Sequence, residues 1–280
     1  MLYKEKFLES LEQIVIELKI KSLKMIYKRG AGHPGGSFSS AEILTSLYFS
    51  KLKIDPRNPC WEERDRFILS KGHASAMLYA ALATKGFFNI KDLDSWGQTS
   101  CHLQGHPDRN KTPGVDMSTG TLGHGLNIAS GMLLASRLKG LNYRVYVLMG
   151  DGEIQSGLIW EGAMTAAKFK LDKLTAILDY NGVQLDGTID KVMPLEPIVE
   201  KWKSFNFEVL TVDGHNIRQL LEAYDEAENI HFKPTIIIAR TIKGKGISFM
   251  ENQNKWHGIA PDKEQYELAI KELKEKRNVG

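Results

Sequence analysis

The sequence has few cysteines, little net charge and no long apolar run. Its 280 residues include two cysteines, Cys60 and Cys101, which are too few for a disulfide framework. The net charge of +3 gives no reason to expect binding to nucleic acid. No segment approaches the length of a transmembrane helix, and the N-terminal MLYKEKFLES lacks the apolar core of a signal peptide. We therefore expect a cytoplasmic protein that binds neither nucleic acid nor membrane.

The apolar residues follow two patterns along the chain, one typical of strands and one typical of helices. They make up 42% of the chain, enough for a large core, and no repeat, linker or low-complexity segment interrupts it. Apolar runs predict five strands, and the segments between them have helical spacing. The strands are expected at 66–70, 143–149, 174–180, 207–212 and 234–242, and helices at 7–29, 41–52, 158–170, 194–205, 213–227 and 262–276. Two further helices are expected, one after KGHASAM that continues through Ala83 and one that follows the glycine-rich turn within 118–138. This alternation predicts an α/β fold, one domain over 1–280 with a parallel sheet and helices on both faces.

Loops and helix caps are predicted between these elements. The glycine-rich segment 31–40 and the irregular polar segment 96–117 are expected to be loops, the second of them at the surface. Ser40 is a candidate cap for the helix that follows it, and Asp213 or Asn216 for the helix at 213–227.

The stretch from Gly150 to Gly187 carries the clearest chemistry. Asp151 follows one predicted strand, and Asn181 and Val183 follow the next. A crossover helix between two strands makes them parallel neighbours, so their carboxyl ends meet at one edge of the sheet. A carboxylate, an amide oxygen and a main-chain carbonyl are suitable ligands for a hard divalent cation that takes its remaining ligands from phosphates and water.

Two other interpretations of the Gly150–Gly152 turn compete with a metal–diphosphate site. Considered alone, GDG is more simply a glycine-rich turn. A dinucleotide fingerprint would require a third glycine at Gln155, and Asp151 would then face a pyrophosphate without a counter-charge. The matching turn at Asn181 favours the metal–diphosphate interpretation.

Histidines recur in the predicted loops. Five of the eight lie in predicted loops beside a glycine: His33, His73, His106, His124 and His257. The chain has no His-x-x-x-His or Cys-x-x-Cys spacing, which disfavours zinc. Histidines on separate strand-end loops suit hydrogen bonding to a polyhydroxylated or phosphorylated substrate, and proton transfer near neutral pH. A loop hydrogen bond is an equal alternative for His33, and we interpret His215 as structural.

These motifs together resemble the transketolase family. GDG followed by the Asn181 turn is similar to the thiamine-diphosphate motif, and AGHPGG, SKGHAS, QGHPD and the loop RTIKGKGISFMENQNKWHGIAP resemble family segments over essentially the whole chain. The resemblance implies a thiamine-diphosphate-binding fold with Mg²⁺, or Ca²⁺ or Mn²⁺ in its place, on Asp151, Asn181 and Val183. It implies cofactor contacts from His73, Gly120, Leu122, Gly150, Asp151, Gly152, Glu153, Asn181 and His257.

The resemblance also assigns catalytic roles and marks departures. It implies that His33, His73, His106 and His257 contact substrate hydroxyls and transfer protons, and that Glu161 belongs to an acidic cluster between subunits. The GHP at His106 argues against the sister family that makes deoxyxylulose phosphate. His124 stands in place of the family's glutamine, and Ser156 in place of a second glutamate. The roles of His124, Lys243 and Lys245 stay open, since the two lysines fit either an anion site or a solvated basic turn.

Only the first part of a transketolase is covered by the resemblance. Full-length members continue through a pyrimidine-binding domain, which supplies the glutamate that activates the cofactor, and a C-terminal domain. This implies the N-terminal subunit of a split transketolase that works with a separate C-terminal subunit in an α2β2 assembly. The reaction implied is transfer of a two-carbon ketol unit from a ketose (phosphate) to an aldose (phosphate). A ketol transferase for a modified sugar, and a non-catalytic regulatory subunit, are the alternatives.

Overall fold

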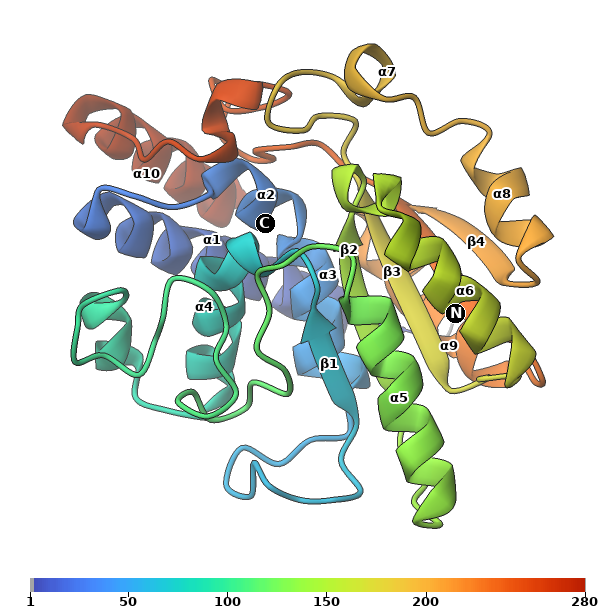
Figure 1. The fold of residues 1–280 in the computed structure, drawn as a ribbon. Coiled ribbons are helices and arrows are strands. Elements are labelled where there is room, and N and C mark those ends of the chain that lie inside the picture. Colours follow the sequence, from blue (N-terminus) through green and yellow to red (C-terminus); the bar gives the residue numbers. More distant parts are fainter. Residues whose placement is uncertain (1–2, 280) are drawn as a thin grey trace.

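The computed structural model describes residues 3–279 and contains one parallel five-stranded sheet (Figure 1). The strand order is β1-β2-β3-β5-β4, and each neighbouring pair is parallel. The strands are β1 (Arg66–Leu69), β2 (Val145–Gly150), β3 (Leu174–Tyr180), β4 (Glu208–Asp213) and β5 (Thr235–Arg240). The predicted α/β fold is therefore confirmed, and all five strands lie within a few residues of their predicted positions.

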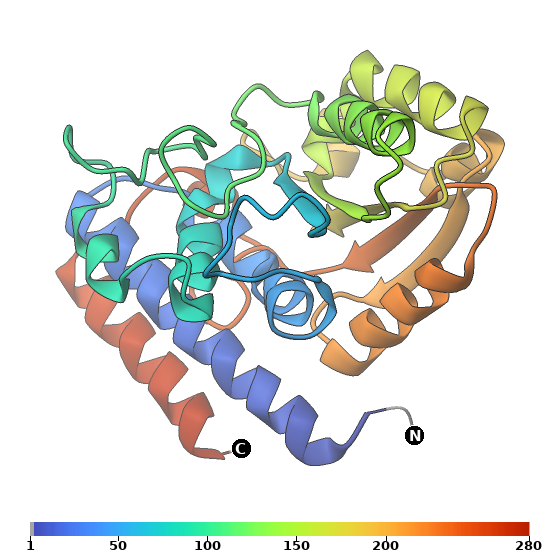
Figure 2. The same cartoon turned by 90° about the horizontal axis from the view of Figure 1, so that it is seen from below.

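Helices cover both faces of this sheet (Figures 1 and 2). One face carries α5 (Gly125–Leu138), α6 (Gly157–Lys168) and α8 (Ile198–Ser204). The other carries α1 (Glu5–Arg29), α3 (Ala41–Ser46), α4 (Ser75–Lys85) and α9 (Ile217–Asn229), with α10 (Lys263–Val279) outside α1. The short helices α2 (Pro34–Ser39) and α7 (Ile189–Val192) lie at the edge where the strands end. Within the described residues, no helix combines the length and apolarity that crossing a membrane requires.

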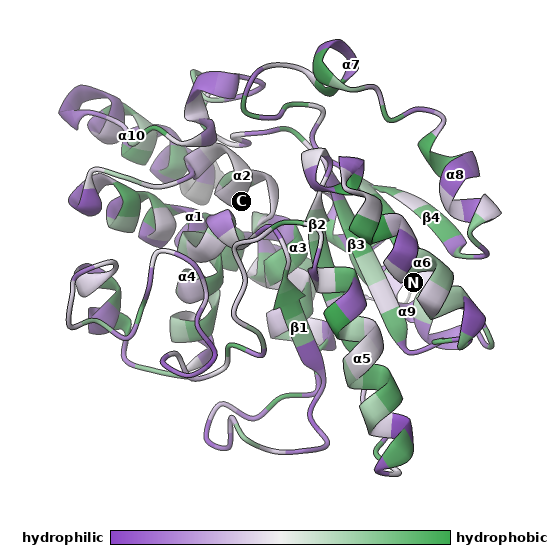
Figure 3. Ribbon diagram, viewed as in Figure 1, coloured by the Kyte–Doolittle hydropathy of each residue, from purple (hydrophilic) through white to green (hydrophobic). Residues whose placement is uncertain are grey.

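Two hydrophobic cores result, one on each side of the sheet. Along β3, Ala176 and Leu178 belong to the core beneath α5 and α6, whereas Ile177 belongs to the core beneath α1 and α3. Alternate side chains of a strand point to opposite faces, so a strand buried on both faces must be apolar throughout. Figure 3 shows this hydrophobic character in the inner strands. The sheet is thus a rigid support for the residues that follow its strand ends.

The segment 31–40 was expected to be a loop, but its residues Pro34–Ser39 form helix α2. Pro34 occupies its first position, where the fixed φ of proline suits a helix start. Gly35 and Gly36 allow tight packing, since a Cβ on Gly35 would lie 2.9 Å from the carbonyl oxygen of Trp256, and one on Gly36 3.2 Å from Nε2 of His73. The two glycines therefore allow the backbone of α2 to pack closely against Trp256 and His73.

The predicted helix end and cap are wrong at α3, whereas one of the two predicted caps of α9 is confirmed. α3 stops at Ser46 and continues as a π-helical turn, Leu47–Lys51. Ser40 does not cap α3, because its hydroxyl donates to the carbonyl of Gly36 in the preceding helix, at 2.8 Å. Asn216 does cap α9, since its side-chain oxygen accepts a hydrogen bond from the main-chain N–H of Gln219.

The irregular segment from Trp96 to Met117 is less superficial than we expected. It follows the short 3₁₀ helix η3 (Ile90–Ser95), and Trp96 and Leu103 are buried. Trp96 Nε1 donates to the carbonyl of Gln104 at 3.0 Å, and the N–H of Gly97 donates to the carbonyl of Leu103 at 2.9 Å. These bonds close the loop at its neck and bury apolar side chains beneath it.

Candidate active site

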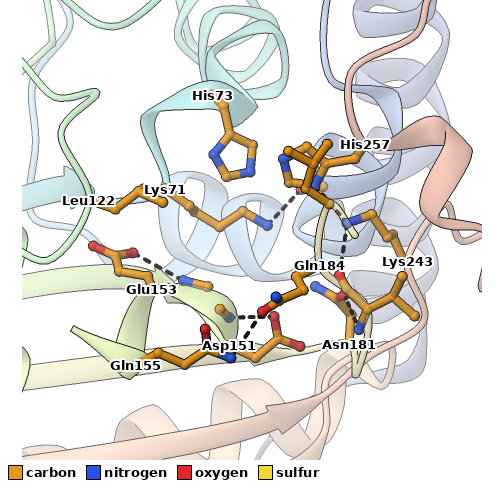
Figure 4. A pocket seen from close by; sticks show the side chains of 15 residues that line it. Lys71, His73, Leu122, Asp151, Glu153, Gln155, Asn181, Gln184, Lys243 and His257 are labelled. Atoms are coloured by element: carbon orange, nitrogen blue, oxygen red, sulfur yellow. Dashed lines mark hydrogen bonds between the residues drawn. The ribbon is translucent and has the colours of Figure 1, made fainter. Parts of the chain in front are cut away.

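A pocket of ≈ 290 Å³ opens where β1, β2, β3 and β5 end (Figure 4). Ligands bind at this edge of open parallel sheets because loops from several strands meet there. The lining residues come from the segments that follow these strands and from α2: Gly36, Lys71, His73, Leu122, Gly150, Asp151, Gly152, Glu153, Gln155, Asn181, Val183, Gln184, Leu185, Lys243 and His257. Sequence segments far apart in the chain therefore meet in one cavity.

The three predicted metal ligands lie together in this pocket. Asp151 is buried, and its two carboxylate oxygens accept hydrogen bonds from the N–H groups of Gly152 (2.8 Å) and Gly182 (2.6 Å). Asn181 Oδ1 accepts the N–H of Val183 at 3.2 Å, and the carbonyl of Val183 accepts a hydrogen bond from Lys243 Nζ at 2.8 Å. The backbone thus holds the ends of β2 and β3 together.

The chemistry of these oxygens fits a hard cation. Burial, followed by the nearby charge of Asp179, raises the pKa of Asp151 to about 6, so an uncompensated carboxylate is unfavourable here and a bound cation would offset its charge. No group of three or more His, Cys, Asp or Glu side chains in the described chain could hold a metal. A cation at this place would thus take amide and carbonyl oxygens beside one carboxylate, and further ligands from a phosphate group or water.

Two buried lysines supply the positive charge of the pocket. Lys71 forms an ion pair with Asp179 on β3 and donates to the carbonyl of Gly36 at 2.9 Å. Lys243 is 2% exposed, and burial together with the charge of Lys71 lowers its pKa to about 8. Its Nζ lies 3.0 Å from His257 Nδ1 (Figure 4). The sequence left Lys243 open between an anion neighbour and a solvated turn, and its burial excludes the solvated turn.

Three of the four predicted catalytic histidines form one cluster. The ring centroids of His33, His73 and His257 lie 5.1 to 5.6 Å apart. Burial is the main cause that lowers the pKa of His33 to about 4 and of His257 to about 3, and it lowers that of His73 well below its ordinary value. All three imidazoles are therefore neutral near pH 7 and can both donate and accept hydrogen bonds. Because Lys243 donates to Nδ1 of His257, the proton of that ring is on Nε2.

The remaining predicted site residues divide into three groups. His106 and Gly120 line an adjoining cavity of ≈ 630 Å³, together with His124. Leu122 lines the main pocket and is 42% exposed at its mouth. Glu161 is exposed on α6 and, among the described lining residues, belongs to neither cavity. The structure thus brings every predicted cofactor-binding residue to one of two adjacent cavities and leaves Glu161 outside them.

Glu153 lines the pocket but is already engaged in holding the backbone. Its Oε1 accepts hydrogen bonds from the hydroxyl of Ser70 and from the N–H of Gly123 (2.8 Å), and its Oε2 from the N–H of Gly150 (3.2 Å). Burial raises its pKa despite these bonds. Glu153 therefore connects the ends of β1 and β2 with the turn at Gly123.

Sequence reasoning missed three polar lining residues. Lys71 directly follows the strand that also leads to His73, so its place at a strand end could have identified it. Gln155 Nε2 donates to Gln184 Oε1 at 2.9 Å, which joins the segments after β2 and β3 across the mouth of the pocket. Nothing in the local sequence around Gln155 or Gln184 indicates this pairing.

Residues 10–277 match the family model described as "Transketolase, thiamine diphosphate binding domain". The chain belongs to the transketolase family. A transketolase relative from Clostridium sp. (strain MSTE9), the 6-deoxy-6-sulfo-D-fructose transketolase subunit SqwG, is 45% identical over 90% of this chain and 92% of its own length. An apulose-4-phosphate transketolase subunit from Phocaeicola vulgatus is 40% identical over 96% and 95%.

Full-length transketolases are similar over only part of their length. The human transketolase is 37% identical, and the match covers 95% of this chain but 42% of that protein. The crystal structure of the Campylobacter jejuni transketolase superposes with a TM-score of 0.89 at 32% identity, and covers 96% of this chain and 42% of that one. The Pichia stipitis transketolase complex with sedoheptulose 7-phosphate has a TM-score of 0.90 at 28% identity, over 96% and 41%. The chain thus spans about two fifths of a full-length transketolase.

Proposed function

We propose that this chain is the N-terminal, diphosphate-binding subunit of a split transketolase that uses thiamine diphosphate and a divalent cation. With a separate C-terminal subunit, it transfers a two-carbon ketol unit from a ketose to an aldose. One observation carries this proposal: Asp151, Asn181 and Val183 share a pocket with His73 and His257 at the carboxyl edge of the sheet, and the ring of His33 packs against both imidazoles.

The residues of the pocket have separable tasks in this proposal. Asp151, Asn181 and Val183 would hold Mg²⁺, and Lys243 and the backbone at Gly150 and Gly152 would face the diphosphate. Thiamine diphosphate, when bound, supplies an electron sink for the carbon that is left negative when the ketose is cleaved. Lys243 would move from the carbonyl of Val183 toward the diphosphate, since a cation on that carbonyl would repel the ammonium.

The histidines would position the sugar and move its protons. A neutral imidazole can accept a proton from a hydroxyl of the ketose as the carbon–carbon bond breaks, and return it to the aldose in the second half of the reaction. His33, His73 and His257 lie close enough to contact neighbouring hydroxyls of one sugar chain. His106, in the adjoining cavity, would contact the same substrate from another side.

The names of the relatives support the proposal of a partner. Relatives of similar length are named as subunits, and full-length transketolases continue for more than half of their sequence beyond the matched part. Apolar side chains at the pocket mouth, Leu122 and Leu185, are 42% and 58% exposed, as expected where a second protein covers the site. We propose that residues 1–280 form one diphosphate-binding domain, that the partner carries the pyrimidine-binding and C-terminal domains, and that two copies of each form an α2β2 assembly.

A ketol transferase for a modified sugar is the second candidate. Two relatives that match nearly this whole chain are named for 6-deoxy-6-sulfo-D-fructose and for apulose 4-phosphate, and both sugars carry an anionic group. Both candidates share the cofactor, the cation and the two-carbon transfer. They differ only in the sugar, and both favour an anionic substrate.

Ketol transfer by the purified chain, alone and mixed with the product of the adjacent reading frame, tests the proposal. Both samples receive thiamine diphosphate and Mg²⁺, and the donors include fructose 6-phosphate and 6-deoxy-6-sulfofructose. Transfer only in the mixture supports the split enzyme, and the preferred donor decides between the two candidates. Transfer by the chain alone would contradict the need for a partner. Cofactor binding without transfer from any donor would favour a regulatory subunit.

A further inference from the structure

The main chain around His106 is anchored at every carbonyl. The segment 101–107 lies between η3 and α5, where the chain forms neither helix nor strand, and it loops beside α4 (Figures 1 and 2). Each of its carbonyls nevertheless accepts a hydrogen bond of 2.6 to 3.2 Å. The donors, in the order of the carbonyls, are Gln104 Nε2, Thr112 Oγ1, the N–H of Gly97, Trp96 Nε1, Ser75 Oγ, the Tyr79 hydroxyl and the N–H of Thr119. An irregular segment whose carbonyls are all paired has little freedom to move.

Two of these donors come from one face of α4. Ser75 and Tyr79 are four residues apart on this helix, so their side chains point the same way. Ser75 Oγ donates to the carbonyl of Gly105 at 2.7 Å, and the Tyr79 hydroxyl donates to the carbonyl of His106 at 3.1 Å. Both side chains are fully buried, and burial raises the pKa of Tyr79, so its hydroxyl keeps its proton. Two successive carbonyls are thus fixed to α4, because leaving buried groups unpaired would be costly.

The same helix also supports His73. It begins directly after the 3₁₀ helix η2 (Gly72–Ala74), which contains this histidine. A Cβ on Gly72 would lie 3.0 Å from the main-chain nitrogen of Gly120, and a Cβ on Gly120 would lie 3.3 Å from Cδ2 of His106. Close contacts therefore run from the turn of His73 through Gly120 to the ring of His106, and α4 holds both ends of this series.

The imidazole of His106 depends on these supports for its position. The residue is exposed, and its ring makes no hydrogen bond with any residue between 3 and 279. Its place is therefore determined by its own backbone and by packing against Gly120. A displacement of a reacting group by ~1 Å can cost about a hundredfold in rate.

We infer that Ser75 and Tyr79 are positioning residues: by holding the carbonyls of Gly105 and His106, they fix the His106 imidazole relative to His73, so that both rings contact one sugar. This inference rests on the proposed role of His106 in ketol transfer. The two hydroxyls act through the histidine and not on the substrate, since Ser75 and Tyr79 are buried and line neither the main pocket nor the adjoining cavity.

A double-mutant cycle between Tyr79 and His106 tests the inference. The assembled enzyme, with the C-terminal subunit, thiamine diphosphate and Mg²⁺, receives fructose 6-phosphate or 6-deoxy-6-sulfofructose as donor and glycolaldehyde as acceptor. Tyr79→Phe removes only the hydroxyl and should lower kcat/KM about tenfold or more when His106 is present. In the His106→Ala background the same change should lower kcat/KM by about twofold at most, because the group that the hydroxyl positions is absent.

Further variants control the cycle. Ser75→Ala should show the same dependence on His106, and it supplies the cycle if Tyr79→Phe does not fold. Tyr146→Phe and Ser22→Ala delete similarly buried hydroxyls that have no hydrogen-bond partner in the described part of the chain. Both should keep the kcat/KM of the wild type, and circular dichroism shows which variants fold.

The outcomes separate this inference from the function on which it rests. Loss of kcat/KM by the same factor in both backgrounds would mean that the hydroxyls stabilise the chain independently of His106, and would overturn the inference alone. Unchanged kcat/KM in Tyr79→Phe and Ser75→Ala, or in His106→Ala itself, would also overturn it while the proposed function stands. A wild-type assembly that transfers from neither donor would overturn the proposed function and the inference together.

Discussion

At the scale of single residues, the site depends on charges that are buried in pairs. Asp179 is fully buried at the end of β3, and burial alone would raise its pKa. The ion pair with Lys71 outweighs that effect and lowers the pKa, helped by the hydroxyls of Ser39 and Thr241. The same Lys71 ammonium binds the carbonyl of Gly36 in α2, so one ion pair fixes the helix that follows His33 to the strand that leads to Asn181.

Lys71→Met should therefore destabilise the chain strongly. It leaves the Asp179 carboxylate buried without its partner, which typically costs about 3–5 kcal/mol of unfolding free energy. Urea denaturation followed by circular dichroism measures this loss. Lys139→Met is the matched control, because Lys139 is 65% exposed and lies 3.7 Å from Glu62, and it should change stability by less than about 0.5 kcal/mol. A Lys71→Met variant as stable as this control would contradict the role of the pair.

Asp151→Ala should abolish cation-dependent binding of thiamine diphosphate. The variant loses the one carboxylate of the proposed cation site, so the affinity for the cofactor in Mg²⁺ should fall at least about a hundredfold, to the level measured with EDTA. Isothermal titration calorimetry of the assembled enzyme measures the change. Asp186→Ala, an exposed carboxylate on the loop after β3, is the control and should bind as the wild type does. Equal cofactor affinity in Asp151→Ala and the wild type would contradict the metal assignment.

At the scale of elements, a buried charged network joins α1, α3 and the ends of β4 and β5. Glu42 on α3 accepts from Lys19 Nζ on α1 at 2.8 Å and lies 3.0 Å from Nδ1 of His215. Nε2 of His215 accepts the N–H of Ile242, so Nδ1 carries the proton and donates to Glu42. His215 is structural, as expected, and it fixes the backbone directly before Lys243 of the pocket.

Glu42→Gln should destabilise the chain in a pH-dependent way. Burial alone would raise the pKa of Glu42, but Lys19 and His215 hold it below its ordinary value. A folded-state pKa below the unfolded one stabilises the fold above the unfolded pKa, and this contribution disappears as the pH falls through the folded pKa. The variant should lose about 3 kcal/mol at pH 7, as expected for a broken buried pair.

Denaturation of both proteins between pH 7 and pH 3 tests this dependence, because the two stability curves should converge as the medium becomes acidic. Glu264→Gln, in the first turn of α10, removes an exposed carboxylate and should show no such convergence. A constant difference between Glu42→Gln and the wild type over this range would contradict the role of the charge.

At the scale of the whole molecule, the features that could be predicted follow from local sequence patterns. Those that could not be predicted depend on contacts between distant segments. The strands were predictable because a strand buried on both faces must be apolar, and the proximity of Asp151 and Asn181 was predictable because the carboxyl ends of parallel strands meet. The insertion of β5 between β3 and β4 was not predictable, since strand neighbours are set by packing between distant segments. The burial of Lys71 was missed for a related reason, because its partner Asp179 comes from another strand.

The surface around the pocket leads to a prediction about assembly. Leu185 lines the pocket mouth and Met193 directly follows α7; they are 58% and 55% exposed. Phe232 is 74% exposed but precedes β5, at the opposite edge of the sheet. If the C-terminal subunit covers the pocket, an apolar side chain at its mouth becomes buried, and a carboxylate there would be desolvated without a partner.

Leu185→Asp should therefore weaken binding of the C-terminal subunit by at least about tenfold, whereas Phe232→Asp should not change it. Sedimentation velocity of mixtures over a concentration series gives the dissociation constants, and circular dichroism confirms that both variants fold. A general effect of the added charge would weaken binding in both variants, since Phe232 is even more exposed than Leu185. Weaker binding in Phe232→Asp alone would place the partner at the opposite edge of the sheet, where it could not complete a site at Asp151 and Asn181.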